Sequence, residues 1–213
     1  MSADRQGVSD LWDVMSTARM VRRYRPEPVD DAVLRRCLEA ATWAPSGGNQ
    51  QPWRFVVIKD RKTREVIGAA AAETWRIMTE FYGLSLPAAD DLAPRARTIR
   101  SMHEHMMNGA DVPVCVLFCV QPQRGTTELQ TGGSIWPAMQ NFALAARAQG
   151  LGSAVTLWQD QCDADLRALV GVPDDWKIAT IVTAGWPQGG HGPLTRKPLT
   201  DVVAVDRWDQ PLA

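Results

Sequence analysis

Residues 44–55 read Ala-Pro-Ser-Gly-Gly-Asn-Gln-Gln-Pro-Trp-Arg-Phe, and they join a predicted helix to a predicted strand. The two adjacent glycines allow positive φ angles and let another molecule come close to the backbone. The hydroxyl and the three amide side chains are neutral hydrogen-bonding groups, and Arg54 is the one ionisable residue of the stretch. This composition is typical of an ordinary helix-to-strand connection, and equally of a cradle for a flat, uncharged heterocycle.

Hydrophobic periodicity on both sides of this stretch predicts a mixture of helices and strands. The helix before it begins at Asp30 or Asp31 and ends near Trp43, and the strand after it covers residues 53–59. Ser9 is expected to cap the first helix of the chain, and Ser134 the longest and most apolar one. The other predicted elements are helices over 10–18, 61–82, 95–108, 132–149 and 163–170, and strands over 112–121, 151–158 and 176–185.

The composition predicts one folded domain that covers residues 1–213. Apolar residues make up 45% and charged residues 22% of the chain, which is ordinary for a globular protein. The net charge of −1 argues against nucleic acid and acidic membranes as partners. The longest apolar run, residues 112–120, is far shorter than the ~20 residues of a membrane span, and residues 1–13 show no signal-peptide pattern. We therefore expect a cytoplasmic protein.

Cysteine and histidine form no convincing metal or redox motif. No two cysteines have Cys-x-x-Cys spacing, and buried, reduced thiols are expected at Cys37, Cys115, Cys119 and Cys162. His103 and His105 are two residues apart on a predicted helix, so their side chains point in different directions. No metal site is expected.

Two regions lack a clear role from their pattern alone. Residues 70–110 form a helical excursion between two predicted strands, which is typical of a lid or pocket wall but also of a surface helical pair. The tail, residues 188–213, is rich in glycine and proline and holds one short apolar run, 202–205. Packing against a partner subunit would explain these apolar residues.

The motifs of the common catalytic machineries are missing. The chain has no Gly-x-Gly-x-x-Gly, no phosphate loop and no Gly-x-Ser-x-Gly, and no paired carboxylates fall where a cleft is predicted. Four arginines stand within residues 19–25, where they form either a solvated turn or a phosphate clamp. Neutral loops, arginines and tryptophans suit an enzyme whose chemistry belongs to a bound cofactor.

Five motifs stand in order along the chain: Arg19-x-x-Arg22-x-Tyr24, the 44–55 stretch, Gly150-Leu-Gly-Ser153, Gly185-Trp-Pro187 and Arg196-Lys-Pro-Leu199. In this order they resemble the nitroreductase family of FMN flavoproteins. The resemblance implies an α+β fold with a mixed or antiparallel sheet between helices. It also implies an intimate homodimer with two FMN sites, each built from both subunits, and a C-terminal tail that reaches the partner subunit.

The resemblance further implies three groups of FMN-binding residues. One group binds the phosphate, one is a loop that packs on the isoalloxazine of the neighbouring subunit, and one runs along the other side of the ring, where a backbone N–H can reach N5. The first group is Arg19, Met20, Arg22 and Arg196; the second is Pro45, Ser46, Gly47 and Asn49; the third is Val155, Thr156, Leu157 and Trp158.

The match to the family pattern is incomplete at three positions. The family commonly has an arginine where Ala18 stands, a serine where Met20 stands, and a basic residue where Leu194 stands. One phosphate-facing hydroxyl is therefore missing. Either FMN is held less tightly than in other members, or Arg23 compensates.

The implied activity is that of an FMN-dependent oxidoreductase. In a ping-pong reaction, NADH or NADPH delivers a hydride to flavin N5, and a nitroaromatic, a quinone or a similar electron-poor acceptor then takes the electrons; no catalytic side chain is required. Two relatives within the family remain as alternatives: a flavin destructase, and a reductive dehalogenase whose lid binds an amino acid through Glu73, Arg76, Glu80 and Tyr82. A flavin-binding storage or sensor protein without turnover is a third.

Overall fold

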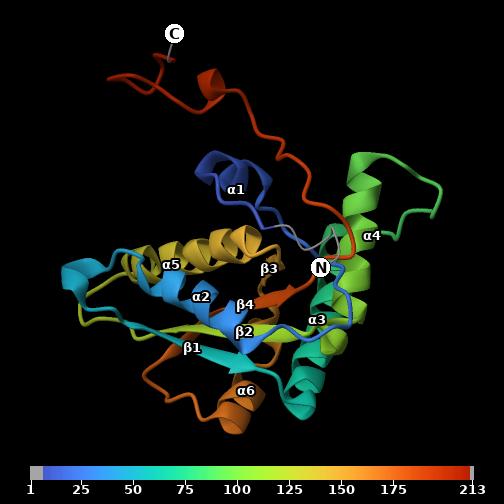
Figure 1. The fold of residues 1–213 in the computed structure, drawn as a ribbon, viewed down its shortest axis with the longest axis horizontal. Helices are drawn as coiled ribbons and strands as arrows, with labels where there is room; N and C mark the ends of the chain where they lie inside the picture. Colours follow the sequence, from blue (N-terminus) through green and yellow to red (C-terminus); the bar gives the residue numbers. More distant parts are fainter. Residues whose placement is uncertain (1–6, 212–213) are drawn as a thin grey trace.

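The computed structural model describes residues 7–211 as a four-stranded sheet with helices on both faces (Figure 1). The strands lie in the order β1-β2-β4-β3, and all three pairings are antiparallel. Their bounds are Trp53–Ile58 (β1), Val114–Val120 (β2), Gly152–Thr156 (β3) and Lys177–Gly185 (β4). The predicted α+β fold is confirmed, with an antiparallel sheet.

The α-helices of the described chain are α1 (Leu11–Thr17), α2 (Asp31–Thr42), α3 (Arg61–Tyr82), α4 (Pro94–Met107), α5 (Glu128–Ala148) and α6 (Asp163–Val170). The helices α2 and α5 pack on one face of the sheet, and α3 and α6 lie toward the other. Most bounds lie within two residues of their predictions. The helices α3 and α6 agree at both ends, whereas the start of α5 does not.

The core forms on both faces of β2 because successive side chains of a strand point to opposite sides. Val116 and Phe118 face α2 and α5, and Phe118 lies between the rings of Phe55 and Phe142, with centroid distances of 4.8 and 5.6 Å. Leu117 faces the layer of α3 and α6. Such a strand, apolar on both faces, holds the rest of the sheet in place.

Helix α5 begins at Glu128, so the predicted start at residue 132 with a Ser134 cap is wrong. Thr127 caps the helix: its hydroxyl accepts from the Gln130 N–H at 3.2 Å, and the Gln130 side-chain carbonyl accepts from the Thr127 N–H at 2.8 Å. This reciprocal capping box stabilises the first turn, and the helix continues through Pro137. Ser134 is a buried residue within the helix.

Replacing Thr127 with alanine should lower the free energy of unfolding by about 1 kcal/mol, because the Gln130 N–H loses its acceptor. Urea denaturation monitored by circular dichroism measures this loss. Ser134→Ala is the matched control and should cost less, because Ser134 does not cap the helix. A larger loss at Ser134 than at Thr127 would contradict the observed helix start.

Helix α1 likewise begins at a different cap from the predicted one. The Asp10 carboxylate, rather than Ser9, accepts from the Asp13 N–H at 3.0 Å. An aspartate in this position also interacts favourably with the positive end of the helix dipole. The shift moves the helix start by one residue.

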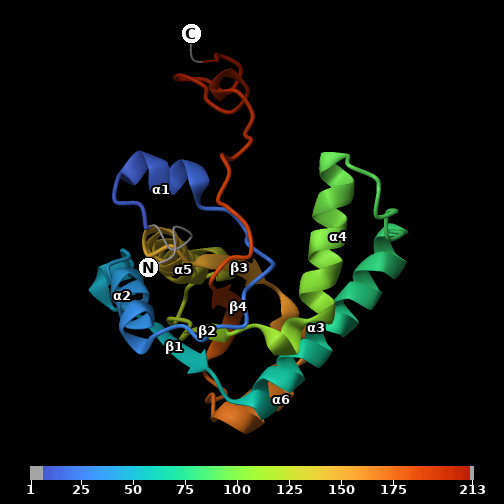
Figure 2. The same cartoon turned by 45° about the vertical axis from the view of Figure 1, so that its right-hand side comes forward.

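The predicted helical excursion over 70–110 is a hairpin of α3 and α4 that stands beside the sheet (Figure 2). The two helices contact one another through the rings of Trp75 and His103, whose centroids are 5.0 Å apart. Arg100 of α4 donates to the carbonyls of Ala88 and Asp91 and so holds the connection between the two helices against α4.

The tail first runs along residues 16–24 and then leaves the body of the chain (Figures 1 and 2). The Gln188 N–H donates to the Arg23 carbonyl, and the Leu194 N–H donates to the Ser16 carbonyl, both at 3.0 Å. Beyond this point several apolar side chains are exposed, and Trp208 is 98% exposed.

The thiols and histidines agree with the sequence predictions. All four cysteines are buried and free. His103 faces Trp75 while His105 faces the core, so the two side chains do point apart. Residues 7–211 contain no cluster of three or more potential metal ligands. None of the helices in that range is long and apolar enough to cross a membrane.

Candidate functional site

The 44–55 loop contains a run of unusual backbone angles. Gly48, Asn49 and Gln51 have φ angles of 57°, 55° and 50°, so the predicted need for glycine is met at position 48. The Ser46 hydroxyl accepts from the Gln51 N–H at 3.0 Å and closes the loop. Left-handed conformations at Asn49 and Gln51 cost energy, and such strain is typical of functional loops.

The loop residues line a cavity of about 380 Å³ between the loop and the start of α5. Pro45, Ser46 and Gly47 form one wall, and Gln130 and Ser134 belong to the other. Asn49 is exposed beside it. Of the predicted site residues, only those of the loop line this cavity.

A second set of predicted residues lies on the segment 19–24, which runs beside β3. The Val21 N–H donates to the Ser153 carbonyl at 2.9 Å, and Met20 forms a parallel bridge with Ser153. This approach requires Gly152, because a Cβ there would lie 2.5 Å from a methyl group of Val21. The glycine-rich motif after α5 therefore places the arginine segment next to β3.

An all-basic cavity of about 500 Å³ opens between this segment, helix α4 and the first residues of the tail. Its charged lining residues are all arginines, and two hydroxyl groups of α4 and two glycines of the tail complete the wall. The lining comprises Arg19, Met20, Val21, Arg22, Arg23, Pro94, Arg97, Thr98, Arg100, Ser101, Gly189 and Gly190. In a chain with a net charge of −1, such a local concentration of positive charge indicates an anion site.

The arginines of this cavity differ in their partners. Arg23 forms a bidentate ion pair with Glu104 of α4, in which the Nη2–Oε1 distance is 2.9 Å. Within residues 7–211, the side chains of Arg19, Arg22 and Arg97 have no ion pair and no hydrogen bond. Arg22 is half-buried, and burial lowers its pKa, with a further contribution from the charge of Arg19. A bound anion would supply the missing counter-charge.

Arg23 is therefore less suited than Arg19 or Arg22 to contact an anion. Its guanidinium is already paired with a carboxylate and connects the 19–24 segment to α4. The suggestion that Arg23 replaces the family's missing hydroxyl loses support for this reason. Met20, which stands where that hydroxyl would be, accepts from the Val155 N–H with its sulfur at 3.3 Å.

Beneath Arg22 lies a buried polar network that the sequence did not predict. The Tyr24 hydroxyl lies 2.9 Å from the Thr183 hydroxyl and donates to the Val21 carbonyl at 2.6 Å. His105 Nε2 lies 3.1 Å from the same Thr183 hydroxyl, and its ring packs 4.8 Å from that of Trp158. Burial, followed by the charge of Arg22, lowers the pKa of His105 to about 3.

This histidine should make folding stability depend on pH. Its pKa is lower in the folded protein than in the unfolded chain, where it is about 6.5, so the unfolded state binds more protons between these values. The free energy of unfolding should therefore fall by about 1.4 kcal/mol between pH 7.5 and pH 5.5 on account of His105.

Urea unfolding at the two pH values tests this prediction, with His105→Gln removing the dependence. His103→Gln is the matched control, because that ring contacts Trp75 on the opposite side of α4. An unchanged pH dependence in His105→Gln would contradict the prediction.

The third predicted group, residues 155–158, lies at the C-terminal end of β3. Its side chains are divided between the surface and the core. Leu157 is 60% exposed, and Val155 is half-buried beside Met20. Thr156 is buried and donates to the Ile181 carbonyl at 2.9 Å. The Trp158 side chain is 1% exposed and belongs to the core. A ligand at this edge would contact the backbone and Leu157 rather than the indole ring.

Two predicted groups stand apart from the basic cavity in this single chain. Arg196 is exposed, and its guanidinium donates to the carbonyl of Thr195 next to it. The residues of the 44–55 loop line a different cavity. Arg76, suggested for a dehalogenase lid, instead pairs with Glu73 and Glu80 on the exposed surface of α3.

The α4 wall of the cavity was missed at the sequence level. Pro94, Arg97, Thr98 and Ser101 are spaced i, i+3, i+4 and i+7, which places them on one helix face. This polar stripe could have been read from the spacing. Its position opposite Arg19 and Arg22 depends on how the α3–α4 hairpin packs, and the spacing does not contain that information.

The fold and the basic cavity together define an α+β protein with a candidate anion site beside its sheet. The family model described as the nitroreductase family matches residues 15–186. The chain is 32% identical over 188 residues to an NADH dehydrogenase of Thermus thermophilus, covering 87% of this chain and 90% of the relative. It is 30% identical over 182 residues to a 5,6-dimethylbenzimidazole synthase of Rhodospirillum rubrum, covering 81% and 80%.

Among solved structures, the fold is similar to that of oxidized iodotyrosine deiodinase bound to FMN and 3-iodo-L-tyrosine. The TM-score is 0.69 at 22% identity, and the match covers 93% of this chain and 99% of that one. The chain belongs to the nitroreductase family. The named relatives in this family support an oxidoreductase.

Proposed function

We propose that the protein is an FMN-dependent NAD(P)H oxidoreductase that reduces nitroaromatics, quinones or similar electron-poor acceptors. The main support is the pair Arg19 and Arg22, which lack counter-charges within residues 7–211 and line an all-basic cavity beside the end of β3. FMN carries a phosphate dianion and a flat ring system, and both fit this combination of arginines and strand edge. When bound, FMN supplies the hydride chemistry between the nicotinamide and the acceptor.

The chain's own residues then serve to bind and orient. Arg19 and Arg22 hold the phosphate through charge-assisted hydrogen bonds. The backbone of Val155 and Leu157 would contact the ring, and the Tyr24–Thr183–His105 network holds the end of the arginine segment against β4. None of these roles requires a side-chain acid or base, in agreement with the lack of catalytic motifs in the sequence.

The 44–55 loop and Arg196 join this site only if a second subunit provides them, so the proposal includes a homodimer. The exposed apolar residues of the chain support it: Trp12 on α1, Trp43 beside the loop and Trp208 in the tail are 76%, 77% and 98% exposed. Covering such surface is the usual driving force for subunit association.

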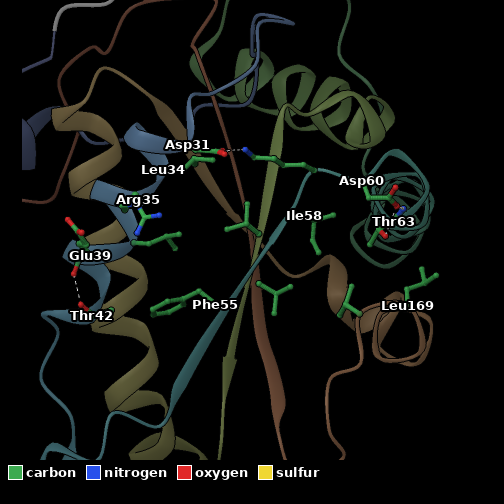
Figure 3. A pocket seen from close by; sticks show the side chains of 15 residues that line it. Asp31, Leu34, Arg35, Glu39, Thr42, Phe55, Ile58, Asp60, Thr63 and Leu169 are labelled. Carbon is green, nitrogen blue, oxygen red and sulfur yellow. Dashed lines mark hydrogen bonds and ion pairs between the residues drawn. The ribbon is translucent and has the colours of Figure 1, made fainter.

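A groove along β1 is the place that suits the partner's tail. β1 is one of the two edge strands of the sheet, and the groove beside it has a volume of about 1010 Å³. Figure 3 shows Leu34 and Phe55 on one side of this groove and Leu169 on the other. An unpaired strand edge with apolar walls favours addition of another strand. The large apolar residues of the tail that are exposed are Leu199, Val202, Val205 and Trp208.

The absorption spectrum of the purified protein is the first test. A flavin band, bleaching with NADH or NADPH under anaerobic conditions, and recovery of the band with a nitroaromatic or quinone would support the proposed reaction. Irreversible loss of the flavin would favour a destructase, as the similarity to the dimethylbenzimidazole synthase allows. A colourless protein that cannot be reconstituted with FMN would refute the proposal.

A further inference from the structure

The basic cavity holds more positive charge than one FMN phosphate neutralises. Five arginines line it, and Glu104 compensates one of them, Arg23. Arg100 donates to two backbone carbonyls, which carry no net charge. Four guanidinium charges therefore remain without a carboxylate among the lining residues, whereas a phosphate monoester carries about −1.5 to −2 at pH 7.

The surplus charge is divided between the two walls. Arg19 and Arg22 lie on the segment that the proposed function assigns to the FMN phosphate. Arg97 and Arg100 lie opposite, on α4, and the Arg97 side chain has neither an ion pair nor a hydrogen bond within residues 7–211. Two separate walls, each with two cations, suit two anionic groups better than one.

The α4 wall has the composition of a phosphate site. Arg97, Thr98 and Ser101 lie on one helix face and line the same cavity. The Thr98 hydroxyl donates to the Pro94 carbonyl at 3.0 Å, so the Arg97 guanidinium and the Ser101 hydroxyl are the donors available to an anion there. The wall also includes Pro94, the first residue of α4, where the helix dipole favours negative charge. Guanidinium, hydroxyl and helix-start groups are the usual ligands of a phosphate monoester.

We propose that the α4 wall, with Arg97 as its principal residue, binds the 2′-phosphate of NADPH and so makes the enzyme prefer NADPH to NADH. This inference rests on the proposed function, in which a nicotinamide nucleotide is the reductant. The dianionic 2′-phosphate is the one group that distinguishes the two nucleotides. A carboxylate group on the electron acceptor would suit this wall less well than the 2′-phosphate. It carries one negative charge, whereas the wall carries two arginines.

The test compares reduction of the bound flavin by NADPH and by NADH in anaerobic stopped-flow experiments. The wild-type protein should bind NADPH more tightly than NADH. Arg97→Ala should raise the dissociation constant for NADPH about 10- to 100-fold. The fold-change in the dissociation constant for NADH should be at least ten times smaller. Arg97→Lys should restore part of the loss, because lysine keeps the charge but not the fork geometry. Arg95→Ala is the matched control: Arg95 is an exposed arginine of the same helix outside the cavity lining.

Several outcomes would overturn the inference. Equal losses of affinity for NADPH and NADH, or no loss, would show that Arg97 does not bind the 2′-phosphate. Release of FMN from Arg97→Ala would place Arg97 in the flavin phosphate site. A loss confined to 4-nitrobenzoate relative to nitrobenzene would assign the wall to the acceptor's carboxylate.

A direct titration separates this inference from the proposed function. Calorimetry with adenosine 2′,5′-bisphosphate and adenosine 5′-monophosphate does not depend on flavin reduction. The wild-type protein should bind the bisphosphate more tightly, and Arg97→Ala should remove the difference. If neither nucleotide bleaches the flavin but this difference is present, the proposed reaction fails and the phosphate site stands. If the difference is absent, the phosphate site is refuted whatever the enzyme's activity.

Discussion

Replacing Arg22 with alanine should release FMN from the protein. Its guanidinium is half-buried and has no counter-charge within residues 7–211, so a bound phosphate is the partner that balances it. Hydrogen bonds to charged groups contribute about 1.5–3 kcal/mol each, so the loss of one should raise the FMN dissociation constant about 10- to 150-fold. Arg19→Ala should have an effect of the same order, and the double variant should be colourless after dialysis. Flavin fluorescence during titration measures the dissociation constants.

Arg23→Ala provides the control within the same segment. Because Arg23 is paired with Glu104, its loss should weaken FMN much less than the loss of Arg22. Arg196→Ala tests whether the tail reaches a flavin site. The variant should weaken FMN binding only if the tail of a subunit reaches a flavin site in the dimer. Retention of FMN by all four single variants would refute the phosphate clamp.

Removing the tail after Pro198 should convert the proposed dimer into a monomer. The tail beyond this point projects from the chain and exposes Leu199, Val202 and Trp208, so its deletion leaves the core intact while the proposed cover of the β1 groove is lost. Light scattering should report a mass near one chain, compared with about twice 23.5 kDa for the full-length protein. Circular dichroism should show an unchanged fold.

Leu169→Asp changes the other side of the same contact. Leu169 is 39% exposed at the wall of the groove, so a carboxylate there should disfavour an apolar tail with little effect on folding. The variant should raise the dimer dissociation constant. A truncated chain that remains fully dimeric would show that the tail does not contribute to the interface, and α1 and α5 would then have to provide it.

Local signals predicted the elements well wherever a cap or a breaker stood next to a periodic run. Helix α3 follows the Asp60 cap and ends before Gly83, which has a φ angle of 58°. Helix α6 ends before Gly171 in the same way. The prediction failed at α5, because its glycines and Pro137 resemble a helix start, whereas the helix begins at the Thr127–Gln130 capping box.

The candidate site also contains residues that the sequence can group and residues that only tertiary packing brings together. Arg19 and Arg22 are close in sequence, so they could be grouped from the sequence alone, whereas the close approach of Val21 to Gly152 became visible only in the structure. Arg97 follows Arg19 by 78 positions and Arg22 by 75. Only the packing of the α3–α4 hairpin beside the sheet places it across the cavity.

The sequence by itself determined the family and the α+β fold, because these depend on local motifs and on hydrophobic periodicity. The tertiary structure decided which groups share a cavity. It places α4 opposite the arginine segment, pairs Arg23 with Glu104, buries Trp158 in the core and leaves the 44–55 loop at a separate cavity. These outcomes follow from contacts between distant segments, whose geometry is set by the packing of whole helices and is not encoded in the spacing of neighbouring residues.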